Sequence, residues 1–332
     1  MLVLDTNVAI DIERFYFGRG GVDPIALRAL LERFPHRGTR PVQFSYGWAV
    51  AEASYVRGRG VDEVKYRSID YACDVVANWS PEDVQRAFDD RRPPVARDKR
   101  WPRRVPLPDN PADPRVALVA PYGALLMLAH LDARRSTGHR QDGEVALREY
   151  VRWLTDELGV RQAYPMTLAS GIFVGTGLSN ESARRVLKIS GAADPDRLAS
   201  TAWNAAWDVL LTSLGEGLTY GLAPVAGGRL HKVVTRNVDP INLRRDVEAR
   251  VIVDTGTSKL PFVSSRVDVS KRANERAVTE ILEMDPLEAF SRHQRSPEAM
   301  LTQAATAVAQ LEERMGVSQR LSFDGWNLRP PA

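Results

Sequence analysis

Several features that would assign a protein to a special class are scarce in this chain of 332 residues. Its one cysteine, Cys73, cannot form a disulfide within the chain, which predicts a reducing compartment. Its five histidines, at positions 36, 130, 139, 231 and 293, do not have the short spacing of zinc ligands. These two shortages argue against a disulfide scaffold and against a histidine-rich zinc site.

Long hydrophobic runs are also lacking. The longest apolar stretch, residues 116–131, contains Pro121 and is shorter than the roughly 20 residues that a membrane span needs. The N-terminus has no basic residues before its apolar start, and Asp5 interrupts that start at once, which is unlike a signal peptide. We therefore expect a cytoplasmic protein with no membrane partner, in which residues 116–131 form a buried helix.

Neither sign of charge dominates, because 45 Lys and Arg residues stand against 42 Asp and Glu residues. A hydrophobic content of 44% and a charged content of 26% are ordinary for a globular protein and argue against disorder. At roughly 100–200 residues per domain, the length allows two domains, or one domain with a large insertion.

Strand patterns alternate with helix patterns near both ends of the chain, whereas the middle is rich in helix patterns alone. This alternation predicts a parallel α/β sheet with a mainly helical insertion. The predicted strands are residues 2–5, 42–45, 232–235 and 249–254. The predicted segments are 1–60 and 196–256 for the two parts of the α/β domain, 61–195 for the helical insertion and 257–332 for a helical C-terminal extension.

Four acidic residues stand out by their positions. Asp5 follows the first predicted strand and Asp239 lies just beyond the strand 232–235, where ligands of open parallel sheets bind. Glu52 and Asp208 lie among small or apolar neighbours, so each carboxylate needs a partner or a cation if it is buried. Taken singly, each also has an ordinary structural explanation, as a helix cap, a helix surface residue or a turn residue.

The order of these motifs carries a resemblance. Val3-Leu-Asp-Thr-Asn-Val, Glu52 between alanines, the helix with Asp208, and Thr235-Arg-Asn-Val-Asp239 together resemble the PIN-domain family of metal-dependent ribonucleases. The resemblance covers about residues 1–60 and 196–255, which is under half of the chain. It implies a PIN-like three-layer α/β/α sandwich with a central parallel sheet, whose acids hold Mg²⁺ or Mn²⁺.

The resemblance also implies roles for single residues. Asp5, Glu52 and Asp208 match the three core acids, and Asp239 matches the later one. Asn237 is an alternative to Asp239, and Asp194 or Asp196 is an alternative to Asp208. The candidate supporting residues are Thr6, Asn7, Asn204, Thr235, Arg236 and Asn237, of which Arg236 could face the phosphate.

The chemistry of oxygen ligands fits this implication independently. Hard divalent cations prefer oxygen ligands, and a metal relieves the repulsion between crowded carboxylates. It also activates water and stabilises charge on a phosphodiester. We therefore expect a hydrolase, and the resemblance implies that it leaves 5′-phosphate and 3′-hydroxyl ends. RNA is the favoured substrate because the family is mostly ribonucleolytic, and DNA stays an alternative.

A basic cluster in the predicted insertion is a second candidate site, for nucleic acid. It combines phosphate-binding cations with one tryptophan on which a base could stack. A solvated proline-rich loop is the alternative explanation. The candidate residues are Arg97, Lys99, Arg100, Trp101, Arg103 and Arg104.

Other functions remain open alongside the nuclease. A non-catalytic nucleic-acid-binding protein and a metal-dependent phosphatase or nucleotide hydrolase are the main alternatives. A toxin or defence effector is a biological role compatible with nuclease chemistry. Toxin-type members are usually single small domains, whereas this chain has an insertion and a C-terminal extension. This difference argues against a simple toxin with a paired antitoxin. The apolar stripe on residues 297–315 could pack within the chain or on a second copy, as in a homo-oligomer.

Overall fold

The computed structural model forms two compact units, Met1–Pro114 with Leu214–Val238 (unit 1) and Arg115–Ser213 with Asp239–Ala332 (unit 2). The segment limits predicted from the sequence, at 60, 195 and 256, were drawn where the pattern of helices and strands changes along the chain. They stay predictions. The structure describes residues 2–33, 44–90, 114–137, 142–188, 194–219, 232–236, 247–254, 259–265, 267–269, 275–283 and 295–323.

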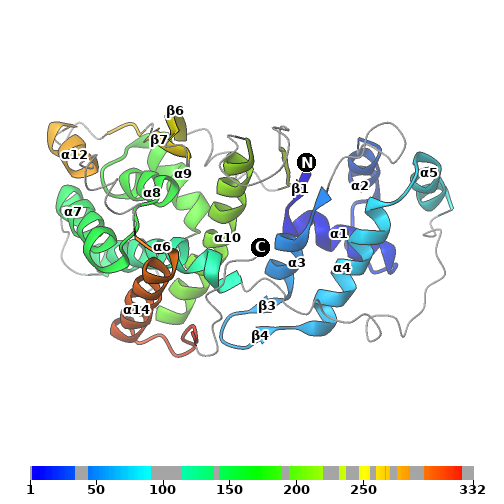
Figure 1. Ribbon diagram of the computed structural model, residues 1–332, viewed down its shortest axis with the longest axis horizontal. Coiled ribbons are helices and arrows are strands. Elements are labelled where there is room, and N and C mark those ends of the chain that lie inside the picture. Colours follow the sequence, from blue (N-terminus) through cyan, green and yellow to red (C-terminus); the bar gives the residue numbers. More distant parts are fainter. Residues whose placement is uncertain are drawn as a thin grey trace. The chain divides into compact units, whose positions relative to one another are not determined.

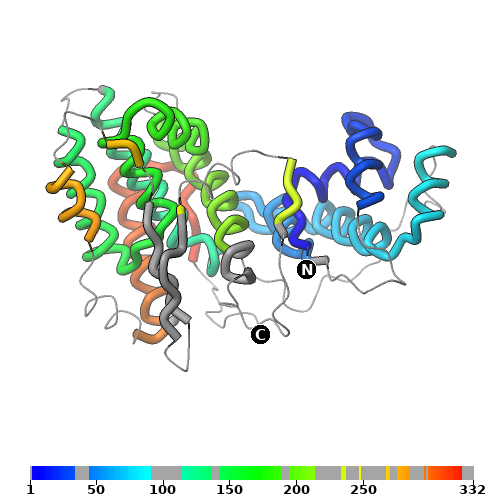
Figure 2. The backbone as a smooth tube through the Cα atoms, turned by 90° about the horizontal axis from the view of Figure 1, so that it is seen from above, coloured from blue at the N-terminus to red at the C-terminus, as the bar shows by residue number. Residues whose placement is uncertain are grey.

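Unit 1 contains a small parallel sheet. Its central strand β1 (Leu2–Leu4) lies between β2 (Phe44–Ser45) and β5 (Lys232–Val234), and both neighbours run parallel to β1. Val3 and Leu4 are each 2% exposed, so the central strand is buried. Figure 2 shows β5, in yellow-green, running beside the dark blue β1, although the two strands are far apart in the sequence.

Most of the described helices of unit 1 begin at a residue whose side chain caps the helix. Asp23 accepts hydrogen bonds from two backbone amides of the next helix, Asp62 accepts one, and Ser80 forms a capping box with Asp83. The helices are α1 (Thr6–Tyr16), α2 (Pro24–Leu31), α3 (Gly47–Ser54), α4 (Glu63–Ala77) and α5 (Pro81–Asp89), with a hairpin of β3 (Tyr55–Val56) and β4 (Gly60–Val61) between α3 and α4.

The core of unit 1 lies between α1, α3 and α4, which pack side by side next to the sheet (Figure 1). Val8, Ile12 and Tyr16 recur every four residues on α1, so they form one buried stripe. Ile69 and Cys73 supply the facing side of α4 in the same core cluster. This packing fixes the start of α1 against the end of β1.

Unit 2 is mainly helical, with α8 packed between α7 and α9. Its helices are α6 (Pro114–Thr137), α7 (Gly143–Trp153), the π-helix η2 (Leu154–Leu158), α8 (Ala163–Phe173), α9 (Gly177–Leu187), α10 (Pro195–Thr219), α12 (Glu275–Leu282) and α14 (Pro297–Met315). The first residue of α6 and the last turns of α10 are assigned to unit 1. Its strands β6 (Val247–Asp254) and β7 (Lys259–Ser265) form an antiparallel hairpin.

One helix in the described ranges, Pro114–Ser136 within α6, is long and apolar enough to cross a membrane by length and composition. However, 78% of its apolar window is buried inside the protein. Leu118, Tyr122, Leu125 and Leu126 are each 0% exposed. The predicted buried helix is confirmed, and a helix of this kind is compatible with a soluble protein.

The predicted three-layer α/β/α sandwich is wrong. The described elements are mostly helices, and among them the parallel sheet has three strands of two or three residues each. The strand predicted at 249–254 exists but pairs antiparallel with β7, because the following segment lies close in sequence and offers it an edge. Short apolar runs mark single strands, but they do not show which strands share a sheet.

Candidate functional site

The candidate site lies where β1 and β5 end. Asp5 directly follows β1 and Thr235 directly follows β5, and the two strands are parallel neighbours, so the residues meet at one edge. The Thr235 hydroxyl donates a hydrogen bond of 2.6 Å to Oδ2 of Asp5. The backbone amide of Thr6 donates one of 2.7 Å to Oδ1. Both carboxylate oxygens of Asp5 are therefore held in place.

Asp5 differs from an ordinary helix cap. An N-cap side chain usually accepts from the second or third amide of the helix. Asp23 does this through Ile25 and Ala26. Asp5 instead accepts from the first helical amide and directs its second oxygen toward β5. Its carboxylate thus connects α1 with β5, and capping alone does not explain its position.

Thr6 links Asp5 to a second acid. Its amide binds Asp5, while its hydroxyl donates a hydrogen bond to Oε2 of Glu52 on α3 and lies 3.5 Å from the carbonyl oxygen of Ala49. Glu52 is half-buried, in keeping with its alanine neighbours, Ala51 and Ala53, which are both buried. Two carboxylates predicted as ligands are thereby joined through one threonine.

The charge of Asp5 is unusual for its burial. The residue is 3% exposed, and in the described part of unit 1 no lysine or arginine forms an ion pair with it. Two other buried acids of α1 do have arginine partners, Asp11 with Arg236 and Glu13 with Arg19. A buried carboxylate is costly without compensation, and at Asp5 the described compensation comes from two hydrogen bonds and the start of α1.

More negative charge lies on α4. Burial raises the pKa of Asp70, and the neighbouring charge of Asp74 raises it further. Burial also raises the pKa of Tyr66, with a smaller contribution from Asp70. Sequence reasoning did not single out Asp11, Glu13 or Asp70. The only sequence signal that could have identified these acids is that they lie among the apolar residues of α1 and α4.

Of the predicted ligands, the structure brings Asp5 and Glu52 together within unit 1. Asp208 is half-buried on α10 and belongs to unit 2, as does the exposed Asn204 one turn before it. Of the two alternatives to Asp208, Asp196 accepts hydrogen bonds from Ser318 near the C-terminus. Asp194 is exposed.

The other predicted site residues contribute little to the described site. Asn7 is exposed. Asp239, Asn237 and the basic cluster at 97–104 lie outside the described residues. Among the residues that the structure covers, no group of three or more His, Cys, Asp and Glu side chains is arranged to hold a metal ion. Asp5 and Glu52 offer two carboxylates, which suits Mg²⁺ in its common mode of one or two carboxylates completed by waters and substrate phosphates.

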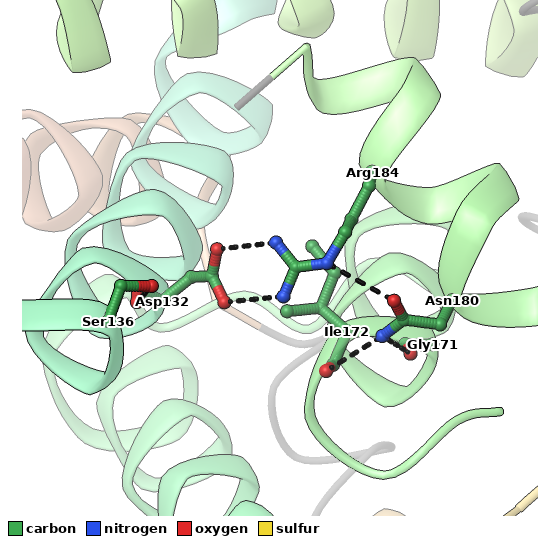
Figure 3. Close-up of polar contacts among 6 residues, drawn as sticks. All are labelled: Asp132, Ser136, Gly171, Ile172, Asn180 and Arg184. Carbon is green, nitrogen blue, oxygen red and sulfur yellow. Dashed lines mark hydrogen bonds and ion pairs between the residues drawn. The ribbon is translucent and has the colours of Figure 1, made fainter. Parts of the chain in front are cut away.

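A second polar cluster, in unit 2, surrounds the buried Asp132 of α6 (Figure 3). Arg184 of α9 donates to both carboxylate oxygens, at 2.9 and 3.0 Å. The Arg184 Nε donates to Asn180, whose amide donates to the carbonyl oxygens of Gly171 and Ile172 at the end of α8. This cluster joins three helices and uses its charges within itself, which indicates a structural role.

In comparisons with known proteins, no family model, no curated protein and no solved structure matches this chain.

Proposed function

We propose that the chain is a cytoplasmic, metal-dependent phosphodiester hydrolase, with RNA as its substrate and DNA as the alternative. The observation that supports this best is the buried Asp5 carboxylate, which hydroxyl and amide groups hold and which Thr6 links to Glu52. The resemblance of the surrounding motifs to PIN-domain ribonucleases points to the same residues.

In this proposal Asp5 and Glu52 hold Mg²⁺ or Mn²⁺. When bound there, the metal would supply Lewis-acid stabilisation of the phosphate and a more acidic water. Thr235 and the Thr6 amide fix the direction of the Asp5 oxygens, and the Thr6 hydroxyl orients Glu52. Outer hydrogen bonds of this kind hold ligands in position before the metal arrives.

The remaining predicted ligands, Asp208 and Asp239, stay part of the proposal as candidates. The same holds for nucleic-acid contacts by the cluster at 97–104. Neither is needed for the argument from Asp5 and Glu52, because Mg²⁺ often binds through two carboxylates and takes its other oxygens from water and substrate.

Cleavage of labelled single-stranded RNA by the full chain tests this function. We expect cleavage with Mg²⁺ or Mn²⁺ that stops in EDTA and falls by on the order of a hundredfold or more in Asp5→Asn. The matched control is Asp23→Asn, because Asp23 also precedes a helix of unit 1 and asparagine caps helices as well as aspartate does.

The outcomes separate the alternatives. RNA binding without cleavage by the wild type would favour the non-catalytic nucleic-acid-binding protein. Hydrolysis of small phosphoesters but not of polynucleotides would favour a phosphatase or nucleotide hydrolase. An equal loss of cleavage in Asp5→Asn and Asp23→Asn would contradict the role of Asp5. Growth arrest on expression, absent in Asp5→Asn, would add the toxin role.

A further inference from the structure

Arg236, the residue after Thr235, forms an ion pair with Asp11 of α1. The Asp11 side chain is 9% exposed, whereas that of Arg236 is 51% exposed. The contact joins Nη1 of Arg236 to Oδ2 of Asp11. A guanidinium carries five N–H donors, so this single contact leaves most of the fork available on its exposed side.

The position of Arg236 follows from its neighbour. Thr235 holds Asp5 at the start of α1, and Arg236 is held by Asp11, six residues further along the same helix. At about 1.5 Å of rise per residue, the two anchor points lie roughly 9 Å apart along α1. The end of β5 is therefore fastened to α1 twice, once at the start of the helix and once between one and two turns further along it.

We propose that Arg236 binds a phosphate group of the substrate beside Asp5, and that Asp11 is a positioning residue for Arg236. This inference rests on the proposed function and gives the site its substrate-binding cation. A guanidinium matches two phosphate oxygens in a planar fork. Asp11 removes part of the rotational freedom of the Arg236 side chain before the phosphate arrives, which reduces the entropy lost on binding.

The chain offers a matched control on the same helix. Glu13 is buried and pairs with Arg19, with side chains 6% and 57% exposed. The Arg19 guanidinium also lies over the Phe17 ring, 5.4 Å from its centroid. The two arginines therefore have similar exposure and a buried acidic partner, but only Arg236 neighbours the residue that holds Asp5.

Binding of a short fluorescein-labelled single-stranded RNA to the full chain in EDTA tests the role of Arg236. We expect Arg236→Gln to weaken binding roughly tenfold, as for one charge-assisted contact, and to reduce the slope of log K against log salt by about 0.7. Arg19→Gln should leave both values unchanged. Equal weakening by the two variants would overturn the proposal, since it would reflect general charge alone.

Asp11→Asn tests positioning, because charge and orientation predict opposite signs. Removal of a negative charge next to Arg236 would by itself tighten RNA binding. If Asp11 positions the guanidinium, binding instead weakens, by about threefold to tenfold. Tighter binding would overturn the positioning role. Arg236→Lys, which keeps the charge and loses the fork, should retain the salt slope but not the full affinity.

The two proposals can fail separately. The binding assay contains no metal and needs no cleavage, so an inactive wild type that binds RNA through Arg236 would refute only the hydrolase. Conversely, metal-dependent cleavage that Asp5→Asn abolishes, with RNA affinity unchanged in Arg236→Gln, would refute only the phosphate-binding role.

Discussion

Unit 1 and unit 2 each bury an aspartate, and they compensate its charge differently. In unit 2, Arg184 contacts both oxygens of Asp132. In unit 1, the oxygens of Asp5 receive hydrogen bonds from Thr235 and from the Thr6 amide, which carry no full positive charge. The first arrangement completes a charge pair within the fold. In the second, the contacts given for the carboxylate oxygens come from neutral groups, which is the arrangement that the proposed cation site requires.

The largest effect on stability is expected in unit 2. Arg184→Leu would leave Asp132 buried without its cation and lower the free energy of unfolding by about 2–3 kcal/mol. This is below the usual cost of breaking a buried pair because Arg184 is partly exposed and water would reach the site. Urea unfolding measures it.

Arg185→Leu is the matched control, since Arg185 is the next residue on α9 and is exposed. Its effect should stay within about 0.5 kcal/mol. A similar loss in both variants would show that the ion pair contributes little, and the contrast between the two aspartates would lose its energetic basis.

An effect of about the same size is expected from metal addition. Mn²⁺ at about one hundred times its dissociation constant should stabilise the wild type by about 2.7 kcal/mol, because the proposed metal site exists only in the folded chain. Asp5→Asn should lose this stabilisation. Asp132→Asn should keep it while starting from a lower stability, because its defect concerns the ion pair with Arg184.

Thermal unfolding with and without Mn²⁺ measures both variants. If Asp132→Asn loses the response and Asp5→Asn keeps it, the roles assigned to the two clusters are reversed. If neither variant changes the response, the metal binds elsewhere.

The smallest effect concerns pH and unit 2. Burial lowers the pKa of His130 from its usual 6.5, as do the charges of Arg134 and Arg314, while Glu149 opposes them. Below about pH 6.5 the unfolded chain therefore binds a proton that the folded chain does not, and stability falls as pH falls. His130→Gln should flatten this decline in urea unfolding between pH 7 and 5. An unchanged slope would exclude His130 as its source.

The sequence predicted the local features of unit 1 better than its architecture. A short apolar run ending in an acid located β1 and Asp5, and the motif after 232–234 located Thr235, because these features are contiguous. The ion pair of Asp11 with Arg236 joins residues 225 positions apart, and nothing in the sequence links them. Asp208 was matched to the core acids by the order of the motifs, and that order did not show that it lies in unit 2 whereas Asp5 lies in unit 1.

The contact between Thr235 and Asp5 has a consequence for synthesis of the protein. It joins residues 230 positions apart, so the first acid of the site acquires this hydroxyl only after most of the chain has left the ribosome. Until β5 emerges, β1 lacks one of its two neighbouring strands, and Asp5 lacks the hydrogen bond from Thr235. A truncated nascent chain would carry the opening motif but not the assembled carboxylate site, so this edge of the sheet matures late in translation.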